Sequence, residues 1–315
     1  MHVKDAWATL KETASDWSDD KASRLAAALA YYSLLSLAPL MVIVIAVAGF
    51  FYGADAARGK IAGQLGAVVG GEAAQGVQSI AASAHSQTGG IVSTIVGVVT
   101  LFIGASGVFG ELQSSLNTIW EVKPKPGRGI LGELKDRFLS FTMVLGVAFL
   151  LLVSLVLSTV LSALGTAFSG ALPGGEGIWQ VVMFLFSFSV VTGLFALIYK
   201  YIPDAEIRWR DVWLGAAVTA LLFTVGKLLL GLYLGKAAPG SSYGAAGSII
   251  ALVVWVYYAA QILFLGAEFT QVQARRSGQG IRPSENAVPT NTDEPDHGAA
   301  QPRGDRAAQR APTPS

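Results

Sequence analysis

Ionisable side chains within long apolar segments are the residues of this sequence whose types could support chemistry. Glu111 follows the apolar run 91–109, Lys227 lies inside the run 212–234, and Glu268 lies near the end of the run 247–270. A charge at membrane depth costs several kcal/mol unless protein or water compensates it, so each position is a functional candidate. The chemistry they could provide is binding of an ionic or hydrogen-bonding group between helices.

Glu111 belongs to a stripe of small and polar residues on one helical face. Small residues on such a stripe allow two helices to pack closely, with Glu111 hydrogen-bonded near the inner surface. The same stripe could instead line a polar cavity, and Asn117 in the same segment is included among the candidate cavity residues. The stripe covers about a third of the helix circumference and consists of Gly97, Thr100, Gly104, Gly107, Glu111 and Ser114.

Lys227 shares a helical face with the small residues Ala216, Ala220 and Gly231. Its long stem could carry the ammonium group to the outer headgroups. The side chain could also point inward and pair with a carboxylate or with an anionic group of a substrate. The sequence leaves both interpretations open.

Another polar stripe lies in the last apolar run, where Tyr257, Gln261 and Glu268 align at positions i, i+4 and i+11. Glu268 is expected to be solvated because it lies near the cytoplasm, whereas the two deeper side chains need partners within the bundle. The first apolar run, 24–51, offers such partners before a proline that is expected to kink it. These residues are Tyr31, Tyr32, Ser33, Ser36 and Pro39.

The elements that carry these residues are predicted to be membrane helices. The chain has 315 residues, of which 52% are hydrophobic, with 36 glycines and no cysteine. This composition is typical of a polytopic membrane protein. The predicted fold class is therefore all-α, a bundle of six transmembrane helices, with spans at about 25–52, 91–117, 138–168, 178–201, 212–235 and 247–270.

Composition and charge also exclude several classes of function. Without cysteine the chain has no disulfide framework and no thiolate metal site. A net charge of +1 argues against binding of nucleic acid. The three histidines, His2, His85 and His297, lie in unrelated regions, so no metal site is predicted and no cofactor is expected.

The distribution of lysine and arginine predicts the orientation in the membrane. With six spans both termini lie on one side, and that side carries fifteen of these residues against three on the other. The positive-inside rule therefore places both termini in the cytoplasm. Four tryptophans are predicted to lie in aromatic belts at the membrane borders, namely Trp120, Trp179, Trp209 and Trp213.

Three regions lie outside the predicted spans. Residues 1–22 are predicted to form an amphipathic helix that either lies in the headgroup region or caps the bundle. Residues 53–90 are predicted to form an extracytoplasmic helical loop, and residues 277–315 a disordered cytoplasmic tail rich in polar residues and proline. The apolar face of the first region carries Trp7, Leu10, Ala14 and Trp17.

Four phrases along the chain are AAALAYYSLLSLAPLM, ELQSSLNTIWEV, YKYIPDAEIRWRDVWLGA and YGAAGSIIALVVWVYYAAQILFLGAEFTQ. Together, across residues 5–275, they resemble the YihY/BrkB family of bacterial inner-membrane proteins. The resemblance implies a six-helix transmembrane protein of the plasma membrane and cell envelope, in a family linked to serum resistance and to lipopolysaccharide precursors. It implies no agreed catalytic residues. The ribonuclease label that the family has carried would need clustered acids or paired histidines.

The predicted function is transport or handling of a lipid or another amphipathic envelope component, without catalysis. Polar faces of helices 1, 2, 5 and 6 are expected to converge on a cavity near Pro39 that opens to the cytoplasm. The alternative is a non-transporting scaffold for envelope machinery. Membrane lipids are the expected partners, with envelope proteins or a second copy of the chain as further candidates. One polar loop is interpreted as a solvated turn held by ion pairs. It carries Asp204, Glu206, Arg208, Arg210 and Asp211.

Overall fold

The structure, a computed structural model, describes residues 3–36, 75, 107–126, 175–237, 245–278 and 280–290. Within these residues helices dominate, and three of them are long and apolar enough to cross a membrane. They are α7 (Gly175–Tyr201), α8 (Trp209–Ala237) and α10 (Ala245–Arg276). Each contains the corresponding predicted span, so these three helices are confirmed. The total of six spans and the cytoplasmic termini stay predictions.

Local sequence explains where these helices begin and end. Pro203 follows α7 and has no N–H with which to continue a helix. Asp211 lies in the first turn of α8, where a negative charge interacts favourably with the helix dipole, and Arg208 Nε donates a hydrogen bond to its Oδ2 at 3.0 Å. Arg275 and Arg276 lie in the last turn of α10, where positive charge is favourable for the same reason.

The remaining predicted spans are described only in part. Residues 22–36 and 107–119 are helical, which agrees with the predicted spans 25–52 and 91–117 over those stretches. The predicted span 138–168 lies outside the described residues. So do Pro39, all of the loop 53–90 except one residue, and the chain beyond residue 290.

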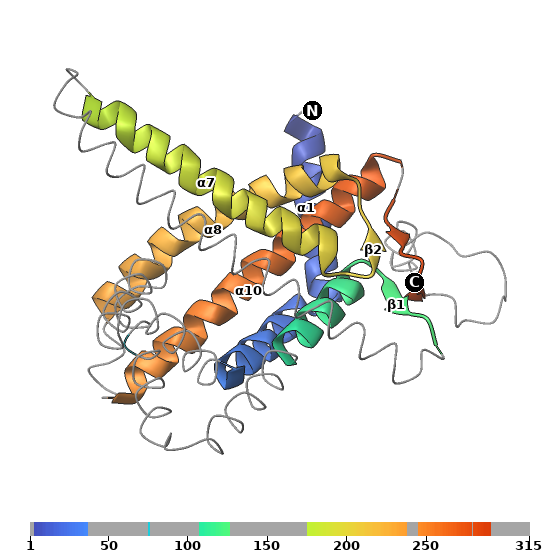
Figure 1. Ribbon diagram of the computed structural model, residues 1–315, viewed down its shortest axis with the longest axis horizontal. Helices are drawn as coiled ribbons and strands as arrows, with labels where there is room; N and C mark the ends of the chain where they lie inside the picture. Colours follow the sequence, from blue (N-terminus) through green and yellow to red (C-terminus); the bar gives the residue numbers. More distant parts are fainter. Residues whose placement is uncertain are drawn as a thin grey trace, which may run out of the picture.

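The helices α8 and α10 lie side by side (Figure 1), and small residues allow their close approach. A methyl group on Gly215 of α8 would overlap the Thr270 hydroxyl of α10. A methyl group on Gly266 of α10 would overlap the hydroxyl groups of both Thr219 and Tyr199. The α8–α10 contact therefore has no room for a larger residue at these two glycines.

Tyr199 of α7 joins three helices in the core. Its side chain is fully buried, its hydroxyl donates a hydrogen bond to the Leu263 carbonyl of α10 at 2.7 Å, and the same oxygen lies 2.9 Å from Thr219 Oγ1 of α8. The Trp120 ring packs edge-on against Tyr199 with 5.9 Å between ring centroids, and its Nε1 donates to the Ala267 carbonyl at 3.3 Å. The prediction that Trp120 lies in an aromatic belt is therefore wrong, because its indole N–H is bonded inside the protein.

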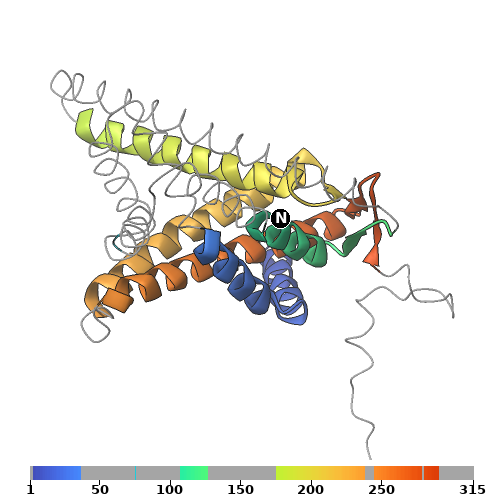
Figure 2. The same cartoon turned by 60° about the horizontal axis from the view of Figure 1, so that its bottom comes forward.

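Two short antiparallel sheets close one end of the bundle, called here the strand end (Figure 2, right). β1 (Val122–Pro124) pairs with β4 (Ala287–Pro289). β2 (Ala205–Glu206) pairs with β3 (Arg282–Pro283). The segment 280–290, called the strap below, thus joins two loops that lie far apart in sequence.

The strap corrects the prediction that the whole of 277–315 is disordered. Its backbone is held by hydrogen bonds from the Ser284 N–H to the Asp204 carbonyl and from the Thr290 N–H to the Glu121 carbonyl, both at 2.9 Å. Composition does not predict such pairing, because every backbone group other than a proline nitrogen can bond whatever its side chain. The ordered chain therefore extends at least to residue 290.

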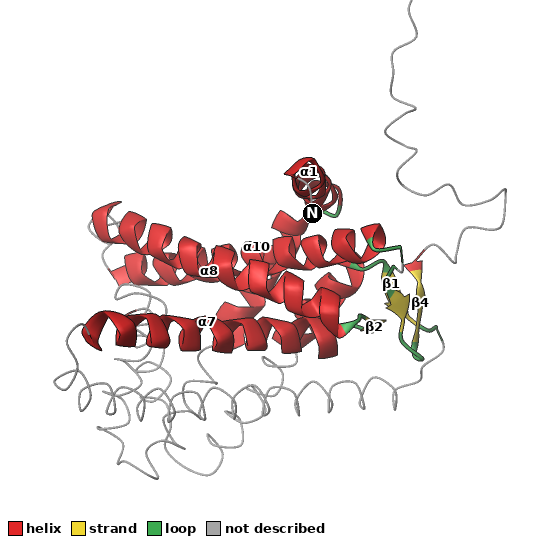
Figure 3. Cartoon of the chain, turned by 90° about the horizontal axis from the view of Figure 1, so that it is seen from above, coloured by secondary structure: helices red, strands yellow, loops and turns green. Residues whose placement is uncertain are grey.

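The N-terminal helix α1 (Val3–Asp19) crosses α10 near the C-terminal end of that helix (Figure 1). Figure 3 shows α1 nearly end-on while α7, α8 and α10 run across the view, so α1 lies steeply across the bundle. It is shorter than the predicted helix 1–22, because a turn at Asp20 and Lys21, where Lys21 has a φ of 55°, separates it from helix 22–36. It packs against α10, so one side of α1 is covered by the bundle.

Candidate functional site

A cavity of about 450 Å³ lies at the strand end and is the candidate functional site. Its walls come from the turn after α1, from helix 107–119 and the β1 segment that follows it, from the loop after α7, and from the end of the strap. Most of the side chains in these walls are polar. They belong to Asp20, Gly110, Gln113, Ser114, Asn117, Thr118, Glu121, Val122, Lys123, Pro124, Asp204 and Thr290.

Helix 107–119 supplies one wall because its polar residues recur every three or four positions. Gln113, Ser114 and Asn117 share a face with Gly110, since residues three and four apart are neighbours on a helix surface. No atom lies within 4 Å of the place that a side chain on Gly110 would begin. The glycine therefore leaves open space in this wall.

A reciprocal pair of hydrogen bonds joins this helix to the loop after α7. Asn117 Nδ2 donates to Asp204 Oδ2 at 2.9 Å, and the Asp204 backbone N–H donates to Asn117 Oδ1 at 2.8 Å. Gln113 Nε2 is a third donor to the same Asp204 oxygen at 3.3 Å. Because the Asp204 carbonyl also accepts the Ser284 N–H of the strap, Asp204 holds three walls of the cavity together.

The lining is rich in hydrogen-bond acceptors. Three carboxylates, those of Asp20, Glu121 and Asp204, are accompanied by one ammonium group, that of Lys123. Carboxylates accept hydrogen bonds and do not donate them when ionised. The cavity is therefore suited to a group that donates hydrogen bonds, such as a hydroxyl-bearing or ammonium-bearing headgroup.

Exposed aromatic residues lie at the same end of the bundle. Tyr201, Trp209 and Trp213 are 50%, 43% and 50% exposed, and their rings form a continuous series with centroids 6.1 Å and 6.4 Å apart. Lys200 Nζ lies 5.8 Å from the centre of the Trp209 ring. Such aromatic residues with a basic neighbour are typical of the border between lipid and water. The prediction of Trp209 and Trp213 at a border agrees with this arrangement.

Among the predicted cavity residues that the structure describes, Asn117 lines this cavity, as does Ser114 of the small-residue stripe. Glu111 is half-buried and accepts a hydrogen bond from Ser115 Oγ at 3.5 Å within its own helix. That contact agrees with the structural alternative considered for Glu111. Lys227 is exposed on α8, so the structure does not bring it to the other predicted residues within the described part of the chain.

The polar stripe of α10 is buried to different degrees. Tyr257 and Gln261 are half-buried, whereas Glu268 is fully buried. The prediction that Glu268 is solvated is wrong, because α10 continues to Arg276 and places Glu268 two turns inside the helix end. The Glu268 side chain is therefore surrounded by protein rather than by solvent.

The hydroxyl-bearing residues of helix 22–36 do not enter the strand-end cavity. Tyr31 and Tyr32 are 60% and 38% exposed, with their rings packed edge-on at 5.7 Å between centroids. Ser36 is buried and donates a hydrogen bond to the Ser33 carbonyl at 3.0 Å. Among the described residues no hydrogen bond joins these four side chains to Tyr257 or Gln261, so the predicted pairing is not seen there.

Sequence reasoning missed Asp204, which it placed in a solvated turn, and the strap, which it placed in a disordered tail. Asn117 and Asp204 lie 87 positions apart, too far for any local pattern to relate them. Both residues nevertheless fall within phrases that carry the family resemblance, ELQSSLNTIWEV and YKYIPDAEIRWRDVWLGA. The presence of both residues in these phrases was the one feature of the sequence that relates the two segments.

Comparison with known sequences agrees with the helical membrane architecture. The family described as "Virulence factor BrkB" matches residues 13–290. The chain is 29% identical over 273 residues to a UPF0761 membrane protein of Pseudomonas aeruginosa (strain LESB58), covering 84% of this chain and 62% of that protein. It is also 29% identical over 274 residues to a UPF0761 membrane protein of Verminephrobacter eiseniae (strain EF01-2), with the same coverage. The chain thus spans 62% of the length of these relatives. No solved structure matches the chain.

Proposed function

The chain belongs to the virulence factor BrkB family of bacterial membrane proteins, and from this premise we propose that it handles a lipid or another amphipathic component of the cell envelope. It is a multi-pass protein of the bacterial cytoplasmic membrane, as its apolar helices and its relatives indicate. In the proposed function the polar part of the component enters the strand-end cavity. Its apolar part stays beside the helices.

The observation that carries this proposal is the position of the cavity. A space of about 450 Å³, lined mainly by polar residues, adjoins the end of α7 and the start of α8, where the exposed aromatic residues lie. Small-molecule sites commonly measure about 300–1,000 Å³. A headgroup could therefore leave the lipid layer and enter the cavity without crossing the apolar core of the bundle.

The acceptor-rich lining supports a particular kind of headgroup. Asp204 and the neighbouring carboxylates would accept hydrogen bonds from hydroxyl or ammonium groups, and would repel an uncompensated phosphate. With six helices and cytoplasmic termini, which remain part of the proposal, the cavity opens toward the cytoplasm. Catalysis is not part of the proposal.

The sharpest test fills the cavity without disturbing the fold. Gly110→Leu places a side chain in open space on a helix and removes a residue with low helix propensity, so the protein should remain stable. In vesicles that contain the purified protein, we expect the rate of transbilayer movement of a fluorescent phosphatidylethanolamine analogue to fall at least tenfold. The matched control is Gly193→Leu, which makes the same change in open space on α7 and should leave the rate unchanged.

The same experiment separates transport from the alternative of a scaffold. Equal rates for the unsubstituted protein, for Gly110→Leu and for protein-free vesicles would contradict lipid movement. The close α8–α10 contact would then favour a rigid platform for other envelope proteins. In that case the cavity would have a structural role only.

A further inference from the structure

The helix α1 contacts the bundle through polar residues. Thr9 and Thr13 carry hydroxyl groups, yet they are only 3% and 2% exposed. Thr9 Oγ1 donates a hydrogen bond to the Asp5 carbonyl at 2.8 Å, and Thr13 Oγ1 donates to the Thr9 carbonyl at 2.9 Å. Because both hydroxyls are satisfied within α1, this face can be buried without the cost of an unbonded polar group.

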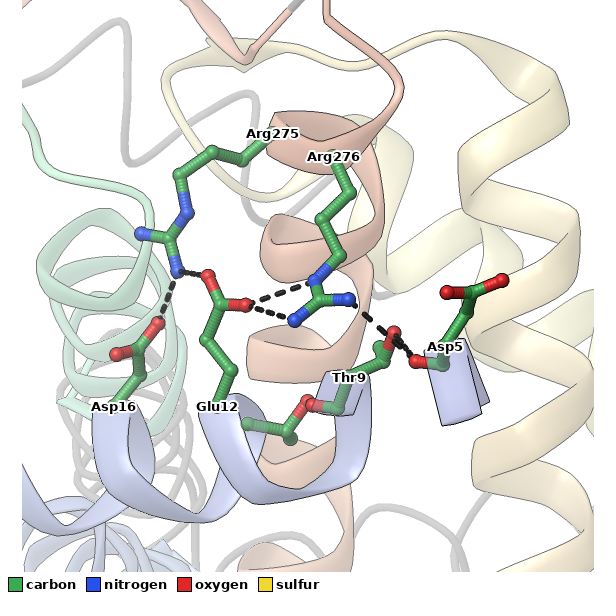
Figure 4. Close-up of polar contacts among 7 residues, drawn as sticks. Asp5, Thr9, Glu12, Asp16, Arg275 and Arg276 are labelled. Carbon is green, nitrogen blue, oxygen red and sulfur yellow. Dashed lines mark hydrogen bonds and ion pairs between the residues drawn. The ribbon is translucent and has the colours of Figure 1, made fainter. Parts of the chain in front are cut away.

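Charged residues on the same face bind the end of α10 (Figure 4). Arg275 forms ion pairs with Glu12 at 2.7 Å and with Asp16 at 2.5 Å. Arg276 makes a two-point contact with Glu12 Oε2, through Nε at 2.8 Å and through a terminal guanidinium nitrogen at 2.7 Å. We call these four residues the α1 clamp. The clamp determines which face of α1 is turned toward the protein.

The opposite face of α1 is apolar and uncovered. Trp7 is 71% exposed, Leu10 is 53% exposed, and Ala14 is also exposed. At 3.6 residues per turn these three residues lie across the helix from Glu12 and Asp16. Trp17, the fourth residue of the predicted apolar face, is instead half-buried and packs against the hydrophobic core. Over Trp7, Leu10 and Ala14 the helix therefore differs from an ordinary surface helix, because its charged side contacts the protein and this apolar part faces outward.

We propose that this outward face of α1 lies in the headgroup layer of the membrane and is covered by lipid. The steep crossing in Figures 1 and 3 places α1 across the membrane helices, at the level where Arg275 and Arg276 end α10. A helix in that position runs along the membrane surface rather than through it. Tryptophan and leucine beside the exposed Lys11 are suited to the border between acyl chains and anionic headgroups.

The size of the face favours lipid over a second copy of the chain. An aromatic side chain buries at most about 250 Å², and Leu10 and Ala14 add smaller areas. A stable protein interface needs about 800 Å² on each partner. Lipid has no such requirement, because each side chain enters the headgroup layer independently.

The absence of cysteine in the native sequence allows a clean test with single spin labels. Nitroxides are attached to Leu10→Cys, Ala14→Cys and the control Ser15→Cys in the full chain, reconstituted in vesicles of phosphatidylethanolamine and phosphatidylglycerol. Ser15 is exposed but lies outside the apolar face. For each label we compare the ratio of its collision rate with oxygen to its collision rate with a water-soluble nickel chelate. We expect this ratio to be at least threefold higher for the labels at 10 and 14 than for the label at 15.

Two outcomes would overturn the proposal. Labels at 10 and 14 that meet the nickel chelate as often as the label at 15 would show that the face is solvated. Labels that are shielded from both reagents and show magnetic coupling between chains, lost on dilution with unlabelled protein, would show that a second copy covers it. Both readouts are independent of lipid movement, so the result stands whether or not the cavity functions as proposed.

Discussion

The two contacts made by α10 use opposite kinds of chemistry. Against α8 the helix packs through glycines whose neighbours leave no space for one further methyl group. Against α1 it uses the long, partly exposed side chains of the α1 clamp. The first contact depends on shape and should tolerate changes of salt and pH. The second depends on charge and should tolerate changes of volume.

The largest effect is expected where the shape of the α8–α10 contact is broken. In Gly266→Ala the new methyl group overlaps the hydroxyls of Thr219 and Tyr199. It therefore either separates α10 from α8 or breaks the hydrogen bond between Tyr199 of α7 and Thr219 of α8. Overpacking of this kind costs about 1–3 kcal/mol. We expect the free energy of unfolding in detergent to fall by about 2 kcal/mol, measured by denaturant titration.

The control variant for this prediction should change the free energy of unfolding in the opposite direction. Gly193→Ala adds the same methyl group where nothing lies within 4 Å, so only the better helix propensity of alanine should count. We expect no loss of stability, and a gain of up to about 1 kcal/mol. Equal stability changes for Gly193→Ala and Gly266→Ala would contradict the view that the α8–α10 contact is limited by shape.

Sequence predicted the shape-dependent region better than the rest of the molecule. A long apolar run indicates that its segment is buried in lipid or protein, and this is a property of each segment by itself. Such runs predicted the spans 178–201, 212–235 and 247–270. The close α8–α10 contact at Gly215 and Gly266 was not itself predicted, although small residues along such segments permit it. The confirmed helices begin two or three residues before the predicted spans; α7 ends where predicted, and α8 and α10 continue two and six residues further.

The candidate site was largely missed for a physical reason. Its walls depend on pairings between distant segments, such as Asn117 with Asp204, or the strap with β1 and β2. Neither periodicity nor composition contains that information, since two-residue and three-residue strands have no hydrophobic pattern. The face of α1 is an intermediate case: its apolar residues were recognised, but only the α1 clamp shows that its polar side faces the protein.

A smaller effect is expected where the α1 clamp is broken. Glu12→Arg places a third cation beside Arg275 and Arg276, so α1 should leave α10 while the membrane helices remain folded. Partly exposed ion pairs are worth about 0.2–1 kcal/mol each. We expect a nitroxide pair at Ser15→Cys and Arg210→Cys to show a longer and broader distance distribution, with unfolding of the bundle unchanged within about 1 kcal/mol.

Exchange of the charges provides the matched control for the clamp. In the double variant Glu12→Arg with Arg276→Glu, the pair is restored with its sign reversed, and the Arg275–Asp16 pair is kept. The distance distribution should return toward that of the unsubstituted chain. A distribution that is unchanged by Glu12→Arg alone would show that packing of Thr9 and Thr13, rather than charge, holds α1 in place.

The smallest effect on the α1–α10 contact should come from lowering the pH, because Glu12 of the α1 clamp then becomes protonated. Partial burial raises the pKa of the Glu12 carboxyl. The hydrogen bonds and positive charges of Arg276 and Arg275 together lower the pKa by more than burial raises it, so the net pKa lies below the ordinary value of 4.5. A carboxyl with a lowered pKa stabilises the docked state above its undocked pKa and loses this contribution as the pH falls through its docked pKa. The nitroxide distance should therefore stay constant from neutral pH to about 4.5 and lengthen below it. At Gly215 and Gly266 the α8–α10 contact is formed by the side chains of Thr270, Thr219 and Tyr199 rather than by carboxylates, so a parallel opening of both contacts in the same pH range would contradict the distinction between them.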